Sequence, residues 1–475
     1  FAYDQARDSF ASLQILKGDL KIVGPPTTAS DKIFHGALFY YILAPIYFVS
    51  GNSPEAAAGV LRIINALGAL IVFWIATTLF RKEVGLLAAF LFAVSYEQSQ
   101  YALFFGHPSL GATSILIYYL GLSLLIFQNK PFGFVLALIG LGLTIQFEDV
   151  NALLLFSLLI FYLVFYKKFK LLKIKHYFWG IIGFSGAVST FILIELKYNF
   201  RTLQAIFSTA NSFNSSSSLN LSYLFSVVMR LINDNLLAGD RASTLIFILL
   251  FMTIAILIYK KIYRNQAIFL AIWFLGGLMP HFLAVKFSYY YSPGASVSLL
   301  ILVAFLIYQG FLRNKMAGSL LIFLIAFSNL NLITAQNIKG VNSDFVIQPG
   351  MLLGNQKKVL DYIYGESAGE EFAVNALTVP LNVKTTWDYL FNWYGKKAYG
   401  TLPVWSGDAA EGFYGELKVI KIRSDLPKKQ FLIIEPTVGI DQSIVINYLK
   451  EENYFTKVVE EKKFGTIIVQ KREKI

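Results

Sequence analysis

Long apolar runs alternate with short polar connections over residues 57–335, and this pattern constrains the fold more than any other feature of the chain. A stretch of about 20 apolar residues can cross a bilayer as a helix, and about ten runs come near that length. They are residues 57–80, 84–103, 109–128, 131–147, 149–166, 177–196, 243–260, 265–284, 289–311 and 316–335. The sequence therefore predicts an all-α polytopic membrane bundle.

Basic residues gather in every second connection between these runs. They are Arg81, Lys82, Lys130, Lys167, Lys168, Lys170, Lys173, Lys175, Lys260, Lys261, Arg264, Arg313 and Lys315. The positive-inside rule assigns these connections to the cytoplasm. The acidic residues of the opposite connections then face outward from an inner (plasma) membrane. We expect an active site, if the protein has one, on that outer side. The acidic residues are Glu97, Glu148, Asp149, Glu195, Asp234 and Asp240.

The composition agrees with a membrane protein. Hydrophobic residues make up 56% of the chain and the mean hydropathy is +0.57, both above the range of soluble domains. The net charge of +12 then reflects topology, so we expect contact with anionic lipid headgroups and no nucleic-acid partner. The absence of cysteine excludes disulfides and thiolate metal ligands.

Residues 1–56 are expected to form one outer loop. Within it, Gly36–Ser50 is apolar but short and contains Pro45, which predicts a juxtamembrane helix on the membrane surface rather than a crossing. The chain starts at Phe1 rather than at methionine, so we expect a further span upstream. Residues 197–242 form a second long outer loop.

Residues 341–475 lack long apolar runs and predict a soluble extracytoplasmic α/β domain. Short buried strands are expected at Phe372–Leu377, Gln430–Glu435 and Thr466–Gln470, and helices near Gln356–Tyr364, Trp387–Tyr394 and Gln442–Glu451. No phosphate-binding loop, His-rich zinc signature or nucleophile elbow occurs in this domain.

Three segments in order carry a family resemblance: Phe1–Asp8, Gly36–Ala44 and Gly51–Ala58. Together they resemble the first outer loop of the GT-C superfamily of polyprenyl-phosphate-sugar glycosyltransferases, in the branch of the lipid A aminoarabinose transferase and the protein O-mannosyltransferases. The resemblance extends over roughly residues 1–335. It implies transfer of one sugar, a hexose or a pentose, from a polyprenyl-phosphate donor to a lipid, glycan or protein acceptor on the outer face, with inversion at the anomeric carbon.

In that family an aspartate of the first loop deprotonates or orients the acceptor, and Asp4 stands at the matching position. Gln5 replaces the usual second acid, so Asp8, one helical turn on, is a candidate for the shared role. A carboxylate suits this task because the acceptor hydroxyl loses its proton as the anomeric carbon is attacked. The alternative is that both residues merely cap or solvate the start of a helix.

The next outer connections supply candidate residues for an active-site cavity. Relatives carry an acid or an asparagine before a proline where this chain has His107, which can orient the acceptor, bind a metal or serve only as a local hydrogen-bonding residue. Glu148 and Asp149 form the polar content of the following outer turn, and Glu97 lies inside an apolar run. Buried carboxylates require solvation, ion pairing or a metal. A divalent cation held by Asp4, His107 and Glu148 is therefore one hypothesis, and a salt-bridged network is the other.

Few cations are available on the outer side to bind the donor phosphate. Lys197 and Arg201 begin the long outer loop, and Lys286 precedes Tyr290 in a segment that resembles the family element near the lipid phosphate. Such cations would stabilise the charge that develops on the departing phosphate. The alternative assigns the lysines to snorkelling and the tyrosine to an interfacial aromatic belt.

Two other classes of function stay open on the sequence alone. A secondary transporter also carries charges in a helical bundle, but near the midplane of discontinuous helices. A membrane anchor or receptor for the C-terminal domain needs no acidic cluster. A shared outward-facing cavity of Asp4, His107, Glu148 and Lys286 would favour the enzyme.

Overall fold

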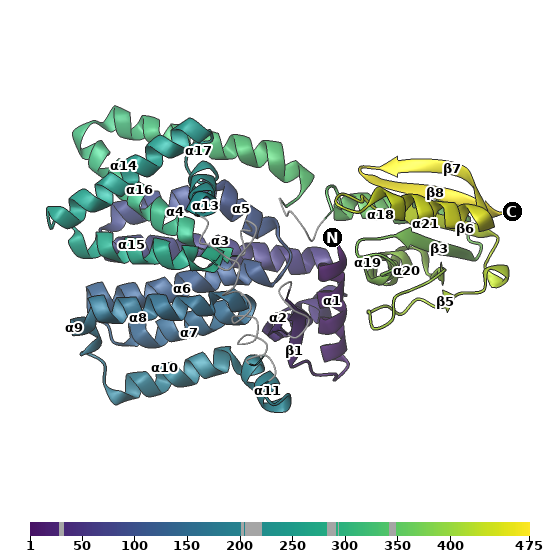
Figure 1. The fold of residues 1–475 in the computed structure, drawn as a ribbon, viewed down its shortest axis with the longest axis horizontal. Coiled ribbons are helices and arrows are strands. Elements are labelled where there is room, and N and C mark those ends of the chain that lie inside the picture. The colour runs from purple at the N-terminus through teal and green to yellow at the C-terminus, as the bar shows by residue number, and fades with distance from the viewer. Residues whose placement is uncertain (28–32, 201–203, 205–220, 283–290, 293, 342–347) are drawn as a thin grey trace. The chain divides into compact units, whose positions relative to one another are not determined.

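The computed structural model describes all of residues 1–475 except 28–32, 201–203, 205–220, 283–290, 293 and 342–347. The chain divides into two compact units (Figure 1). Unit 1 comprises Phe1–Leu20, Ile42–Ala57 and Lys339–Ile475, and unit 2 comprises Lys21–Tyr41 and Ala58–Ile338. The helices α2 (Leu38–Ser50) and α3 (Pro54–Leu79) belong partly to each unit.

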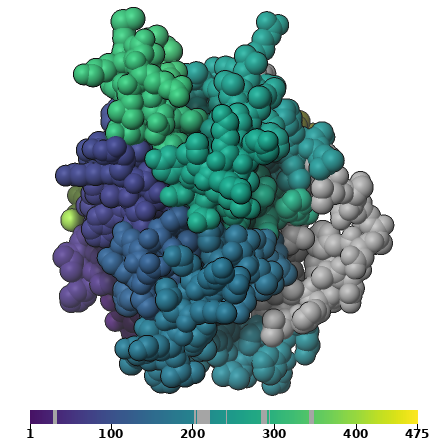
Figure 2. Space-filling view, turned by 90° about the vertical axis from the view of Figure 1, so that its left-hand side faces the viewer, coloured from purple at the N-terminus to yellow at the C-terminus, as the bar shows by residue number. Residues whose placement is uncertain are grey.

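Unit 2 is a helical bundle with one small hairpin of strands β1 (Val23–Pro26) and β2 (Phe34–Gly36). Besides α3, its helices are α4 (Lys82–Val94), α5 (Tyr96–Leu103), α6 (His107–Gln128), α7 (Phe132–Phe147), η1 (Asp149–Leu153), α8 (Leu154–Val164), α9 (Tyr166–Phe169), α10 (Ile174–Ala187), α11 (Ser189–Lys197), α13 (Leu221–Asn233), α14 (Asp240–Tyr259), α15 (Arg264–Leu278), η2 (Met279–Phe282), α16 (Ala295–Arg313) and α17 (Lys315–Gln336). Figure 2 views the molecule from the end at which α9 lies. Segments from the first part of the bundle, in purple and blue, lie beside segments from its last part, in teal and green.

Among the described residues, five helices are long and apolar enough to cross a membrane, or six if the bent pair α10 and α11 counts as one span. The five are α3, α6, α14, α16 and α17. The other predicted runs are also helical but shorter or interrupted. For example, the predicted run 84–103 is divided at Ser95, whose hydroxyl accepts a hydrogen bond from the backbone of Gln98 and so starts α5 as a new helix.

The helices α6 and α7 pack closely as an antiparallel hairpin. A Cβ atom on Gly140 would lie 2.4 Å from the backbone nitrogen of Tyr118, and one on Gly121 would lie 2.4 Å from that of Ala137. Small residues at such contacts let helix backbones approach in a membrane bundle. Large apolar side chains on other helices point away from the bundle; Trp179 is 58% exposed and Phe251 is 66% exposed. Such side chains suit contact with lipid.

The helix predicted in the first loop is present as α2, whose sequence contains Pro45. Its length is below that of a crossing helix, as expected from the sequence. The predicted position on the membrane surface stays a prediction.

The C-terminal part of unit 1 is an α/β domain, as predicted. Its strands are β3 (Phe372–Leu377), β4 (Val404–Ser406), β5 (Val419–Ile420), β6 (Lys429–Ile434), β7 (Thr456–Phe464) and β8 (Ile467–Lys474), in the sheet order β5-β4-β3-β6-β8-β7. The first four strands in this order are parallel to one another. Strand β8 is antiparallel to both of its neighbours, β6 and β7. The accompanying helices are η4 (Asn337–Lys339), which precedes the domain, then α18 (Leu353–Ser367), α19 (Thr385–Leu390), η5 (Phe391–Gly395), α20 (Lys396–Tyr399), η6 (Arg423–Asp425) and α21 (Gln442–Phe455).

The first segment of the chain folds onto this C-terminal domain within unit 1. Helix α1 (Tyr3–Leu16) places the ring of Phe10 5.4 Å from that of Tyr389 and 6.1 Å from that of Tyr414. The hydroxyl of Tyr389 also donates to the backbone oxygen of Asn52 at 2.7 Å. Residues 1–56, which were predicted to form one outer loop, thus belong partly to the unit that contains the C-terminal domain.

Candidate active site

The predicted catalytic acids of α1 form ion pairs with the same arginine. Arg7 Nη1 lies 2.5 Å from Asp4 Oδ1, and Arg7 Nη2 lies 2.8 Å from Asp8 Oδ1. Residues three and four positions apart share a helix face, so Asp4 and Asp8 lie on the same side of α1, with Arg7 between them. Arg7 was not predicted as a site residue, although its spacing from Asp4 and Asp8 is visible in the sequence.

The two aspartates differ in their access to solvent. Asp8 is buried, whereas the side chain of Asp4 is 27% exposed. The Arg7 guanidinium also lies 5.5 Å from the centre of the Tyr3 ring, which limits its movement. Asp4 is therefore an accessible carboxylate held in a fixed orientation.

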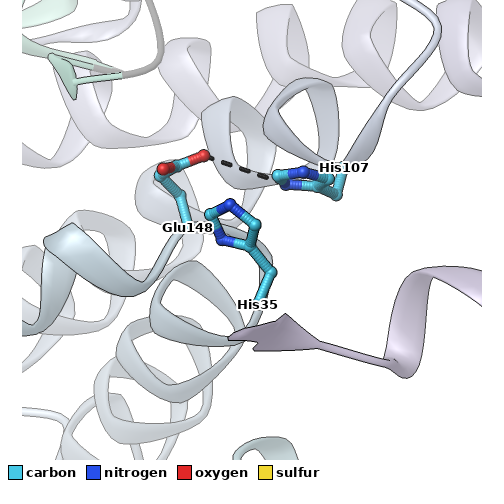
Figure 3. Close-up of side chains that lie close together, drawn as sticks. All are labelled: His35, His107 and Glu148. Atoms are coloured by element: carbon cyan, nitrogen blue, oxygen red, sulfur yellow. Dashed lines mark ion pairs between the residues drawn. The ribbon is translucent and has the colours of Figure 1, made fainter. Parts of the chain in front are cut away.

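A second cluster in unit 2 brings together His35, His107 and Glu148 (Figure 3). His107 begins α6 and Glu148 follows α7, so the antiparallel hairpin brings both residues to the same end of the bundle. His35 reaches them from β2. One potential ligand atom of each residue lies within 4.8 Å of the others. The structure thus joins the predicted residues His107 and Glu148 to a histidine that was not predicted.

Several contacts orient the side chains of this cluster. His107 Nδ1 lies 2.5 Å from the backbone oxygen of Phe147 and 3.8 Å from Glu148 Oε2. His35 Nδ1 lies 3.2 Å from Asp149 Oδ1, and the two imidazole rings have centroids 4.4 Å apart. Asp149 therefore lies beside the His35 ring, and Glu148 lies beside the His107 ring.

The hairpin that carries His35 is anchored on the end of α7. Gly36 lies so close to Gln146 that a Cβ atom would be 1.9 Å from the end of its side chain. Gln146 is fully buried and hydrogen-bonds Thr190. In the amide orientation that gives both the oxygen and the nitrogen of Gln146 hydrogen-bond partners, the oxygen accepts from the backbone nitrogens of Ala37 at 3.2 Å and Leu38 at 3.1 Å. Gln146 thus fixes the chain directly after His35.

The Glu148 carboxyl is buried in the turn after α7, and its side chain is only 8% exposed. Burial raises the pKa of Glu148 to about 8, an effect that His35 opposes and Asp149 reinforces. A carboxyl of this kind becomes a stable anion when a cation lies beside it. The site therefore favours a bound positive charge.

Glu97 lies in a different polar network of unit 2. Its carboxylate accepts a hydrogen bond from Asn235 Nδ2 at 2.5 Å, and Asn235 also contacts Ser95 at 2.6 Å. Asn329 joins the same network through the backbone of Asn235. These bonds connect α5 with α17 and with the segment after α13, so the described contacts of Glu97 indicate a structural role rather than a place beside His107.

The predicted phosphate-binding cations are only partly described. Lys197 ends α11, is exposed, and has its ammonium 5.6 Å from the centre of the Tyr198 ring. This contact fits the snorkelling alternative. Arg201, Lys286 and Tyr290 lie outside the described residues, so their roles stay predictions.

Comparison with protein families gives a match over part of the chain. Residues 35–194 match the family of the dolichyl-phosphate-mannose-protein mannosyltransferases. This segment begins at His35 and includes His107, Glu148 and Asp149. None of the curated protein sequences matches the chain.

Solved structures match nearly the whole chain. ArnT from Cupriavidus metallidurans in the apo state has 12% sequence identity and a TM-score of 0.59, over 98% of this chain and 93% of ArnT. The chain has the GT-C fold. The same ArnT bound to undecaprenyl phosphate gives 11% identity, a TM-score of 0.59 and the same coverage. The oligosaccharyltransferase of Archaeoglobus fulgidus in complex with Zn and sulfate has 15% identity and a TM-score of 0.44, over 84% of this chain and 57% of that one.

These findings confirm the resemblance to the GT-C superfamily that the sequence predicted. They also confirm the fold class, a helical membrane bundle with a C-terminal α/β domain. Within this GT-C fold, the acids of α1 belong to unit 1 and the His35, His107 and Glu148 cluster belongs to unit 2.

Proposed function

We propose that this GT-C protein is a membrane glycosyltransferase that transfers a sugar from a polyprenyl-phosphate-linked donor to a lipid, glycan or protein acceptor outside the cytoplasm. The observation that carries the proposal is the cluster of His35, His107 and Glu148, which lies within the segment that matches the mannosyltransferase family. The undecaprenyl phosphate bound to ArnT, which shares the fold, supports the class of donor.

The orientation of the cluster supports an extracytoplasmic reaction. Lys130 lies in the turn that joins α6 to α7, at the opposite end of the hairpin from His107 and Glu148. By the positive-inside rule the end with Lys130 faces the cytoplasm. The cluster then faces outward.

Asp4 is proposed as the base that accepts the proton of the acceptor hydroxyl. Its partial exposure gives an acceptor access, and its ion pair with Arg7 fixes the direction of the carboxylate. A positioned carboxylate of this kind typically accelerates a reaction by about 10²–10⁴-fold. Asp8 is proposed to act indirectly, because it is buried and holds the other side of Arg7.

The residues His35, His107 and Glu148 fit a divalent cation. Two imidazoles and one carboxylate match the ligand preferences of Zn²⁺, and Asp149 supplies the outer carboxylate that commonly orients a metal-binding histidine. When bound, such a cation would stabilise negative charge on an oxygen of the donor or the acceptor. In this proposal His35 takes the place of Asp4 as the third metal ligand beside His107 and Glu148.

The donor phosphate is proposed to contact Lys286, with Arg201, Lys197 and Tyr290 as further candidates from the sequence. An ammonium at the phosphate would stabilise the charge of the departing group. This assignment rests on the family resemblance of the segment around Lys286 alone.

A transfer assay tests the proposed function. Full-length protein in lipid nanodiscs would receive polyprenyl-phosphate donors with radiolabelled hexoses, pentoses and amino sugars, together with membrane extract as the source of acceptor. We expect one donor class to be consumed, with free polyprenyl phosphate and a labelled acceptor as the products. Folded protein that consumes none of these donors would refute the proposal.

A further inference from the structure

A groove in unit 1 runs along one side of α1. Its volume is about 420 Å³. One wall is α1 with the residues after it, and the other wall is the loop 413–416 of the C-terminal domain. The lining residues are Phe10, Leu13, Gln14, Lys17, Asp19, Phe413, Tyr414, Gly415 and Glu416.

The loop that forms the second wall is held from behind by a buried carboxylate. Asp388 is fully buried and accepts hydrogen bonds from the backbone nitrogens of Glu416 at 2.9 Å and Leu417 at 2.8 Å. Lys384 Nζ, at 2.5 Å, balances its charge. Thr385 adds a hydrogen bond of 2.6 Å to the backbone oxygen of Tyr414.

Gly415 is required at the point where this loop approaches α19. Its φ of +154° is a conformation that residues with a Cβ atom rarely adopt, and a Cβ atom there would lie 2.5 Å from Asp388 Oδ2. The wall therefore has a backbone path specified by Gly415 and Asp388. A rigid wall favours a preformed site over an accidental depression in a loop.

The chemistry of the groove combines aromatic rings with hydrogen-bonding groups. Phe413 is the exposed ring, at 41%, whereas the Phe10 ring is buried and stacks on that of Tyr414. The side-chain oxygen of Gln14 is buried and has no hydrogen-bond partner within the described part of the chain. The rim carries an ion pair of Lys17 and Glu416 at 3.1 Å. Apolar surfaces with a few placed polar groups are typical of small-molecule sites.

The stripe of α1 that lines the groove begins at Tyr3, the residue directly before Asp4. Tyr3, Phe10, Gln14 and Lys17 follow each other at helical spacing, so they lie on one stripe of the helix. At the start of this stripe the Tyr3 ring lies 5.7 Å from the Phe413 ring and also contacts Arg7. At 1.5 Å per residue, Gln14 lies about 15 Å along the axis from Asp4.

We propose that this groove binds the saccharide part of the acceptor, several sugar units away from the hydroxyl that Asp4 deprotonates. Sugar rings present apolar faces to aromatic side chains and hydroxyls to groups such as the Gln14 oxygen. A polyprenyl chain would instead need a continuous apolar tract, and a free anion would meet the Glu416 carboxylate beside Lys17. The inference rests on the proposed function, and it adds that the acceptor is an oligosaccharide or a glycan-bearing molecule.

Glycan binding by the full chain tests this site directly. Detergent-solubilised protein would be applied to an array of immobilised glycans of the hexose, pentose and amino-sugar classes, and the affinity for the best glycan would be measured in solution. We expect Phe413→Ala and Gln14→Ala each to weaken that affinity about tenfold or more. Tyr454→Ala is the matched control, because Tyr454 is an 80% exposed aromatic residue of the same domain that does not line this groove.

A second readout separates this inference from the proposed function. Donor consumption by wild-type protein, measured as release of polyprenyl phosphate, reports on the enzyme class whether or not glycans bind. The groove proposal is overturned if no glycan on the array is retained, or if both groove variants bind the best glycan as tightly as wild type. Gln14→Ala retains the aromatic wall, so it stays informative if Phe413→Ala does not fold.

Discussion

The two acidic clusters differ in what balances their charge. In α1 of unit 1, Asp4 and Asp8 share the guanidinium of Arg7, which is always protonated in proteins. In unit 2, Glu148 is buried beside His35 and His107, whose charge depends on pH and on ligands. The first cluster carries its own counter-ion, whereas the second gains one when a metal or a proton binds.

This difference suggests separate roles for carboxylates that the sequence alone presents as one group. A carboxylate that is partly exposed and held by an arginine can accept a proton from a substrate, as proposed for Asp4. A buried carboxyl beside two imidazoles is instead suited to bind a cation, as proposed for Glu148. The following predictions test this division, beginning with the largest expected effect.

Asp4→Asn should lower the rate of sugar transfer by about a hundredfold or more, because the amide cannot accept the proton. Asp8→Asn should lower the rate less, because Asp8 is buried and contacts Arg7 rather than the acceptor. Initial rates at saturating donor measure both. Equal losses in the two variants would show that the carboxylates act as a pair.

Glu148→Gln and His107→Ala should each weaken Zn²⁺ binding by at least about tenfold, measured by calorimetry on chelator-treated protein. Glu55→Gln is a suitable control, because Glu55 is an acid of unit 1 that pairs with Lys357 of the same unit. Metal binding that survives both cluster variants would assign His35, His107 and Glu148 to a hydrogen-bonded network without a cation.

Gln146→Ala should destabilise the attachment of the β1–β2 hairpin by about 1–3 kcal/mol, since the backbone nitrogen of Leu38 would lose its acceptor. Because His35 lies directly before this attachment, Zn²⁺ affinity should fall as well. Thermal unfolding and calorimetry on the same sample measure the two effects. A destabilised variant with unchanged affinity would mean that His35 is not a ligand.

Lys17→Ala should change stability by only about 0.2–1 kcal/mol, because its ion pair with Glu416 is exposed to solvent. The side chains of this pair are 69% and 58% exposed, in contrast to the Arg7 side chain at 11%. Thermal unfolding in low and high salt provides the measurement. A larger, salt-insensitive loss would mean that Lys17 is part of a more buried network.

The sequence was most informative where one residue type stood out from its surroundings. His107 and Glu148 are polar residues between apolar runs, and both lie in the cluster. His35 lies in a polar loop, where a histidine is unremarkable, and only the pairing of β1 with β2 and the anchor at Gln146 bring it to the others. The residues next to His35 in the sequence therefore do not indicate that it lies beside His107 and Glu148.

The secondary structure of the C-terminal domain shows the same limit. Strands β3 and β6 are buried and apolar, and were predicted from composition. Strand β7 was missed because most of its side chains are exposed, including charged residues such as Glu461 and Lys463, and it is held at the edge of the sheet by β8. The packing of α1 on α19 was missed for a similar reason, since it depends on contacts between segments far apart in the chain.

The separate roles of Asp4 and Glu148 are tested most directly by measuring donor binding, metal binding and sugar transfer side by side in Asp4→Asn and Glu148→Gln. We expect Asp4→Asn to bind the polyprenyl-phosphate donor and Zn²⁺ as wild type does but to transfer almost no sugar, whereas Glu148→Gln should lose Zn²⁺ affinity. If folded Asp4→Asn protein binds donor and transfers sugar at the wild-type rate, Asp4 is not the base, and the base must be sought at Glu148 or Asp149.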